Sequence, residues 1–217
     1  MKRGQLVVVD SPEGAGKTTL LAEVQKKVLA GPLSNRIIFT REPGGTELAE
    51  EIRRVMFGPL GKTANAQTLL SLFWAARADH IEKKISPALM DGVHVISDRF
   101  DSSTFAYQIW GYENYNLVST FNHMREVVMR GLVPFYVFLD VDPVVGLARK
   151  SSTSDRNFID DKPVEFHQRV YKGFGEFFAK FPNTNTRIDA SQLPEKVLED
   201  FLKALDVILI GGRPKQL

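Results

Sequence analysis

The stretch from Val7 to Leu20, VVVDSPEGAGKTTL, holds residues that could bind phosphate. Its end fits the phosphate-loop pattern G-x-x-x-x-G-K-[ST], in which backbone N–H groups at a helix N-terminus surround phosphate oxygens. Lys17 supplies a positive charge, and Thr18 supplies a hydroxyl suited to Mg²⁺. This chain has Ser11 where the pattern expects a glycine, which would cost about 1 kcal/mol only if that position needed a positive φ.

The segments on either side of the loop strengthen this interpretation. An apolar run of the kind found in buried strands precedes it, Gly14 and Gly16 relax the turn, and an amphipathic stretch follows. A plain strand–helix connection with Lys17 in solvent stays open as the alternative, because a bare G-K-[ST] arises by chance in about one chain in ten of this length.

Apolar, β-branched runs alternate with helical patterns along the chain, which predicts a parallel sheet with helices on both faces. The predicted strands are Leu6–Val9, Arg36–Thr40, Val93–Ser97, Phe135–Val141 and Thr186–Ile188. The predicted helices are Lys17–Ala30, Thr46–Met56, Ala66–Met90, Tyr115–Arg130, Pro143–Lys150, Pro163–Phe181 and Pro194–Leu209. The segment Lys150–Lys162 is polar with few apolar anchors, so we expect it to be mobile.

Charged residues end the predicted strands at the edge where open α/β sheets bind ligands. Arg99 could bind an acceptor phosphate, and Asp98 could hold Mg²⁺ directly or through water. Phe73 and Arg77 lie four residues apart and therefore on one side of a predicted helix. Such a pair could hold a planar base by stacking and a directed hydrogen bond, although Phe73 alone would be interpreted as a core residue.

Composition excludes several classes of protein. The 217 residues are 43% hydrophobic and fit one domain, and their net charge of +2 comes from scattered basic residues that do not predict nucleic-acid binding. The absence of cysteine excludes disulfides and thiolate metal sites and favours a cytoplasmic location. The first residues have too short an apolar run for a signal peptide, and no apolar stretch is long enough to span a bilayer. The four histidines lie far apart, which favours structural or surface roles over metal binding.

Several motifs in order along the chain resemble the thymidylate kinases. They are REPGGT, LFWAAR, the DR-x-x-x-S-x-x-AYQ stretch and FLDV-x-P, and with the phosphate loop they extend from about Leu6 to Asp189. The resemblance implies a three-layer P-loop NTPase fold, an α/β domain over residues 1–217 with a five-stranded parallel sheet in the order 2-3-1-4-5 and a lid at about 150–162. It implies Mg²⁺-dependent transfer of the γ-phosphate of ATP to dTMP, giving dTDP, by an enzyme that is generally a homodimer.

The resemblance also implies roles for individual residues. Residues expected to bind the donor nucleotide are Ser11, Pro12, Glu13, Gly14, Ala15, Gly16, Lys17, Thr18, Thr19, Arg149 and Asp189. Those expected to bind dTMP are Asp10, Arg41, Pro43, Phe73, Arg77, Arg99, Ser103, Thr104, Tyr107 and Gln108. The expected catalytic residues are Lys17, Arg99, Arg156 and Glu13, and the expected metal ligands are Thr18 and Asp98.

The loop and the lid together resemble the bacterial type of this family. Glu13-Gly14-Ala15 stands in the loop where another type has an arginine, and Arg156 stands where the bacterial type has a lid arginine. Arg149 is the alternative for that role. Glu13 is expected to face the acceptor sugar or a metal-bound water. No general base is needed, because the attacking phosphate is already ionised near neutral pH.

Other functions remain open at this level. Phe105 and the bulky Trp110–Tyr115 segment are expected to border the sugar and base, so a kinase with altered or broader deoxynucleotide specificity is the first alternative. A P-loop switch GTPase or ATPase is less favoured, because no guanine-binding N-K-x-D motif follows a strand.

Overall fold

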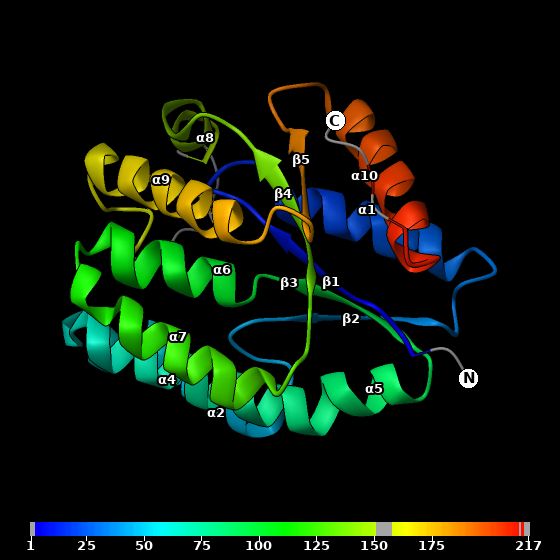
Figure 1. The fold of residues 1–217 in the computed structure, drawn as a ribbon. Coiled ribbons are helices and arrows are strands. Elements are labelled where there is room, and N and C mark those ends of the chain that lie inside the picture. The colour runs from blue at the N-terminus through cyan, green and yellow to red at the C-terminus, as the bar shows by residue number, and fades with distance from the viewer. Residues whose placement is uncertain (1–2, 151–157, 213, 215–217) are drawn as a thin grey trace.

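The computed structural model describes residues 3–150, 158–212 and 214, and its centre is a five-stranded parallel sheet (Figure 1). The strands are β1 Leu6–Asp10, β2 Ile37–Arg41, β3 His94–Asp98, β4 Phe135–Asp140 and β5 Asn185–Asp189. They lie in the order β2-β3-β1-β4-β5, so the sheet order and the fold class expected from the sequence are confirmed. The carboxyl ends of all five strands meet at one edge, where Arg41 pairs with Asp98 and Asp140 with Asp189.

The helices cover both faces of the sheet and give three layers. Their bounds are α1 Lys17–Leu29, α2 Glu47–Phe57, α3 Pro59–Thr63, α4 Ala66–His80, α5 Ser86–Met90, α6 Asp101–Thr104, α7 Val118–Met129, α8 Pro143–Lys150, α9 Val164–Lys180 and α10 Pro194–Leu209. In Figure 1, α1 and α10 lie together on one side of the sheet, and α4, α7 and α9 lie on the other.

Alternation along β1 divides the core between these layers, as the two-residue period of a strand requires. Val7 and Val9 pack in a cluster with residues of α1 and α10. Leu6 and Val8 point the other way, into a larger cluster with α4, α7 and α9. Both faces of the strand are therefore buried, which explains its continuous apolar sequence.

Four segments depart from the predicted helices. The segment Ala66–Met90 is helical throughout but contains a π-helical turn, η1, at Ile81–Ile85. A second π-helical segment, η2 at Phe105–Gly111, continues α6 directly after β3, where no helix was predicted. The short α3 was also not predicted, and a 3₁₀ turn, η3 at Tyr115–Leu117, begins the helix expected from Tyr115. The remaining elements begin and end within two residues of their predicted positions.

Candidate active site

A cavity of about 1320 Å³ opens at the carboxyl ends of the strands. It is lined by the loop after β1, the ends of β2 and β3 and the segment after β5, together with residues of α2, α4, η2, α8 and α10. Lining residues that were predicted from the sequence are Ser11, Pro12, Glu13, Gly14, Ala15, Gly16, Lys17, Thr18, Thr19, Arg41, Pro43, Phe73, Arg77, Asp98, Arg99, Ser103, Tyr107, Gln108 and Arg149. The topology therefore places most of the expected donor-side and acceptor-side residues around one space.

The phosphate loop joins β1 to α1 through two glycines with positive φ, Gly14 at 72° and Gly16 at 79°. Ser11 is not among the residues with positive φ, so the substitution at this position carries no backbone strain. Gly14 also lies directly against the backbone of α8, since a Cβ added to it would come within 1.8 Å of the carbonyl oxygen of Gly146. The conformation of the loop is thus constrained both by its own glycines and by its contact with α8.

Arg99 follows β3 directly, and its guanidinium contacts both the phosphate loop and α6. Its Nη1 donates to Asp10 Oδ1 (3.3 Å), the Ser11 carbonyl oxygen (3.2 Å) and Ser103 Oγ (2.9 Å), while its Nη2 donates to Glu13 Oε1 (3.2 Å). Its backbone has a φ of 66°, an uncommon conformation for a residue other than glycine and one that tends to occur at functional sites. Arg99 therefore ties the phosphate loop to the end of the neighbouring strand.

Glu13 is surrounded by donors from three elements. Tyr107 donates to its Oε1 (2.9 Å), and Lys150 donates to its Oε2 (2.9 Å). Burial alone would raise the pKa of Glu13, but the charges of Arg99 and Lys150 and the hydrogen bonds outweigh burial and lower that pKa to about 2. Lys150 also pairs with Asp160 at 3.0 Å, so it joins the phosphate loop to the chain beyond α8.

Lys17 is buried and paired with Asp98 across the cavity, which rules out the alternative of a lysine in solvent. Burial and the nearby charge of Arg99 lower the pKa of Lys17, while Asp98 opposes that change. Thr18 is exposed to the same cavity. A hydroxyl and a carboxylate beside a phosphate loop suit Mg²⁺, which is commonly held by one or two protein oxygens together with nucleotide phosphates. Within the described residues no group of three or more acidic, histidine or cysteine side chains could hold a metal alone.

One part of the cavity lining combines an aromatic ring with buried polar groups of α4 and η2. The half-buried Phe73 and the buried Arg77 both line the cavity, as their spacing on one helix side predicted. Arg77 is 1% exposed, and its Nη1 has no hydrogen-bond partner among the described residues. Gln108, which is 3% exposed, likewise has no partner for its Oε1 there. Because buried polar atoms are normally paired, this donor and this acceptor indicate a ligand with the matching groups.

Three of the predicted residues that the structure describes do not line the cavity. Asp10 is fully buried behind Arg99 and accepts hydrogen bonds from Ser102 and Ser103, both at 2.6 Å. Thr104 accepts a hydrogen bond from Arg77 Nη2 (3.0 Å) beneath the pocket. Asp189 is exposed and turned to its own loop, where it accepts from the Ser191 N–H (2.8 Å). Arg156 lies outside the described residues, and so does most of the expected lid, residues 151–157.

The aromatic residues expected to reshape the acceptor pocket do not reach it. Phe105 packs in the core against Phe121 (5.2 Å between ring centroids) and Phe177 (5.7 Å). Trp110 packs against Tyr115 (5.2 Å), and none of these rings lines the cavity. Their expected position was wrong because η2 turns Tyr107 and Gln108, rather than Phe105 and Trp110, toward the cavity.

Sequence reasoning missed three residues of the site. Lys150 contacts Glu13 from α8, and Arg53 lines the cavity from α2 and donates to the Pro43 carbonyl oxygen at 3.0 Å. Glu42 was quoted within the REPGGT motif but given no role, although it accepts a hydrogen bond from Arg77 Nε at 2.8 Å. The only signal in the sequence was the place of Glu42 in that motif.

Outside this cavity the structure agrees with two further expectations. His80 is fully buried in contacts with Glu42 and Thr40, and His94 accepts a backbone hydrogen bond from Gln5. Among the described helices, none combines the length and the apolar character needed to cross a bilayer.

Comparisons with known proteins agree with this arrangement. The sequence model of the thymidylate kinase family matches residues 9–201. The chain is 34% identical to the thymidylate kinase of Clostridium novyi (strain NT) over 209 residues, covering 94% of this chain and all of that protein. It is 36% identical to that of Oenococcus oeni over 214 residues, covering 97% and 99%. The crystal structure of thymidylate kinase from Ehrlichia chaffeensis superposes with a TM-score of 0.73 at 27% identity, covering 94% of this chain and 99% of that one. The chain therefore belongs to the thymidylate kinase family.

Proposed function

We propose that this protein transfers the γ-phosphate of ATP to dTMP and so produces dTDP. The single observation that carries the choice of acceptor is that Arg77 Nη1 and Gln108 Oε1, a donor and an acceptor without partners among the described residues, belong to residues that line one cavity. The edge of thymine offers the O4 acceptor and the N3–H donor, which are complementary to this pair. Cytosine offers an amino donor and a ring-nitrogen acceptor. Its donor would face the donor of Arg77 and its acceptor would face the acceptor of Gln108, so the buried groups would stay unpaired.

Phosphoryl transfer between two anions needs positioning and positive charge more than proton transfer. Lys17 and the backbone N–H groups of the phosphate loop would hold the donor phosphates, and Arg99 and Arg41 would hold the acceptor phosphate. Both arginines line the same cavity as Lys17. We propose that Arg156 adds a further positive charge to the transferring group, since its place in the sequence matches a lid arginine.

We also propose that Mg²⁺ is the metal cofactor, held by Thr18 and Asp98 together with phosphate oxygens. When bound, the ion would supply charge neutralisation at the donor phosphates. Asp98 would then leave its pairing with Lys17, which frees the lysine to face the incoming phosphates. Asp10 and Thr104 are proposed to act indirectly, by fixing Arg99 and Arg77.

An acceptor panel with ATP tests this function. Purified protein should phosphorylate dTMP best, dUMP less well and dCMP least, and Gln108→Leu should lower kcat/KM for dTMP by about tenfold or more. Ser119→Ala, on the exposed side of α7, is the matched control and should change nothing. Equal or better activity on dCMP would overturn the choice of acceptor and favour the broader deoxynucleotide kinase.

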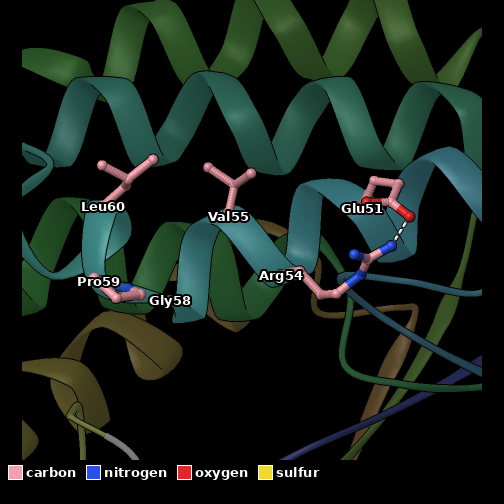
Figure 2. A pocket seen from close by; sticks show the side chains of 6 residues that line it. All are labelled: Glu51, Arg54, Val55, Gly58, Pro59 and Leu60. Carbon is pink, nitrogen blue, oxygen red and sulfur yellow. Dashed lines mark ion pairs between the residues drawn. The ribbon is translucent and has the colours of Figure 1, made fainter.

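We further propose that residues 1–217 act as one domain in a cytoplasmic homodimer. The outer side of α2 and α3 exposes Leu48, Val55 and Leu60, the last by 73%. Figure 2 shows Val55 and Leu60 projecting side by side at a pocket of about 250 Å³, next to the Arg54–Glu51 ion pair. A second copy of the chain would remove this apolar area from water.

Light scattering on the purified protein tests the assembly. The wild type should have the mass of two chains, and the pair of changes Val55→Asp and Leu60→Asp should give one chain. Val133→Asp is the control, because Val133 is 66% exposed in the turn before β4. A monomeric wild type at micromolar concentration would contradict the proposal.

A further inference from the structure

The guanidinium of Arg77 is fixed by two hydrogen bonds and by two aromatic rings. Its Nε donates to Glu42 Oε2 at 2.8 Å and its Nη2 donates to Thr104 Oγ1 at 3.0 Å. The guanidinium also lies over the Trp74 ring, with its central carbon 4.5 Å from the ring centroid, and 5.0 Å from that of Phe100. Nη1 has no hydrogen-bond partner among the described residues, so it is the group that we expect to meet a ligand.

The contacts continue behind Glu42. His80 Nδ1 lies 3.0 Å from the other carboxylate oxygen of Glu42, and His80 Nε2 lies 2.8 Å from Thr40 Oγ1. His80 is fully buried, so no solvent competes for either nitrogen. Gly45 makes room for the second contact, because a Cβ there would come within 2.5 Å of His80 Nε2 and 2.6 Å of Thr40 Oγ1.

The contacts of this buried row fit one arrangement of donors and acceptors. Arg77 is always charged, so an ionised Glu42 balances it without further charge. In this arrangement His80 Nδ1 donates to the carboxylate and Nε2 accepts from the Thr40 hydroxyl, so both ring nitrogens have a partner. The imidazole therefore fixes the carboxylate, and the carboxylate fixes the guanidinium.

We infer that His80 is a positioning residue that sets the selectivity for the acceptor base, acting through Glu42 on Arg77. This inference rests on the proposed function, in which Arg77 Nη1 contacts the base. Without His80, Glu42 can rotate about its side-chain bonds, and Nη1 loses its fixed direction. A buried donor displaced by about 1 Å is enough to lose a large part of its effect on rate and binding.

Kinetics of four single variants test the inference. His80→Leu removes both contacts and should lower kcat/KM for dTMP by about tenfold or more, mainly through KM, with a much smaller change for dCMP. His80→Asn places an amide N–H near the position of Nδ1 and should recover most of the selectivity. Thr40→Val removes only the hydroxyl and should have an intermediate effect. Leu70→Ala, a buried core change on the same helix, should lower the melting temperature and leave the dTMP-to-dCMP ratio unchanged.

Fluorescence gives a readout that does not depend on turnover. The chain has two tryptophans, so in a Trp110→Phe background the emission reports on Trp74, which stacks on Arg77. His80→Leu should shift that emission and His80→Asn should not. An unchanged dTMP-to-dCMP ratio in His80→Leu, or equal emission spectra in the two variants, would overturn the positioning role. A wild type that prefers dCMP would instead overturn the proposed function, while the spectra still decide the role of His80.

Discussion

Replacing Glu13 with glutamine while the pH is varied tests the electrostatics of the phosphate loop. Glu13 has its pKa lowered from the ordinary 4.5 to about 2 by Arg99, Lys150 and Tyr107, which together overcome the opposing effect of burial. Because the folded-state pKa lies below that of the unfolded chain, the ionised carboxylate stabilises the fold above pH 4.5. This contribution disappears as the pH falls from 4.5 toward 2.

The size of the effect follows from the two pKa values. At about 1.4 kcal/mol for each tenfold change in the acid constant, Glu13 contributes about 3 kcal/mol at neutral pH. Linkage predicts that about 1 kcal/mol of this is lost between pH 6 and pH 3.5.

Urea unfolding at several pH values measures this contribution. Glu13→Gln should have a free energy of unfolding lower than that of the wild type by about 3 kcal/mol at pH 6. At pH 3.5 the difference between the two proteins should be smaller by about 1 kcal/mol. Glu126→Gln, an exposed change on α7, is the control for removal of a carboxylate. A gap between wild type and Glu13→Gln that does not vary with pH would refute the reasoning.

Three further changes test the phosphate-transfer machinery. Lys17→Ala should lower kcat by about 10² to 10³, because a buried cation beside the donor phosphates is lost, whereas the exposed Lys26→Ala should leave steady-state rates unchanged. Arg156→Ala should lower kcat by about 10³ by analogy with transition-state arginines, and single-turnover rates within a few-fold of the wild type would exclude that role. Gly14→Ala should abolish ATP binding measured by calorimetry and lower the melting temperature, because its Cβ would overlap the backbone of Gly146; normal binding would contradict the close contact.

Most of the fold could be predicted because local pattern and tertiary burial agree. The continuous apolar run of β1 and the helix pattern of α10 each correspond to a buried strand or an amphipathic helix, and their bounds were predicted to within one residue. The π-helical segment η2 could not be predicted, because a single turn with altered hydrogen bonding leaves no periodic signal in seven residues. That segment decides which aromatic side chains face the acceptor pocket, so the expectation for Phe105 and Trp110 failed with it.

The candidate site was predictable where a motif places residues on one loop or one helix side. The phosphate loop and the Phe73–Arg77 pair are of this kind. Lys150 and Glu13 are 137 residues apart, and Arg77 and Glu42 are 35 apart, so only the folded chain brings each pair into contact. Asp10 illustrates the opposite case, since its neighbours Ser102 and Ser103 bury a carboxylate that the motif alone would place in the pocket.

The meeting of Gly14 and Gly146 has a mechanical consequence. With no side chain between them, the loop and the first half of α8 touch backbone to backbone, so neither has room to move toward the other. A loop that moved toward α8 would therefore press on this helix, whose last two residues are Arg149 and Lys150. The position of the phosphate loop thus constrains the position of α8 through a direct backbone contact.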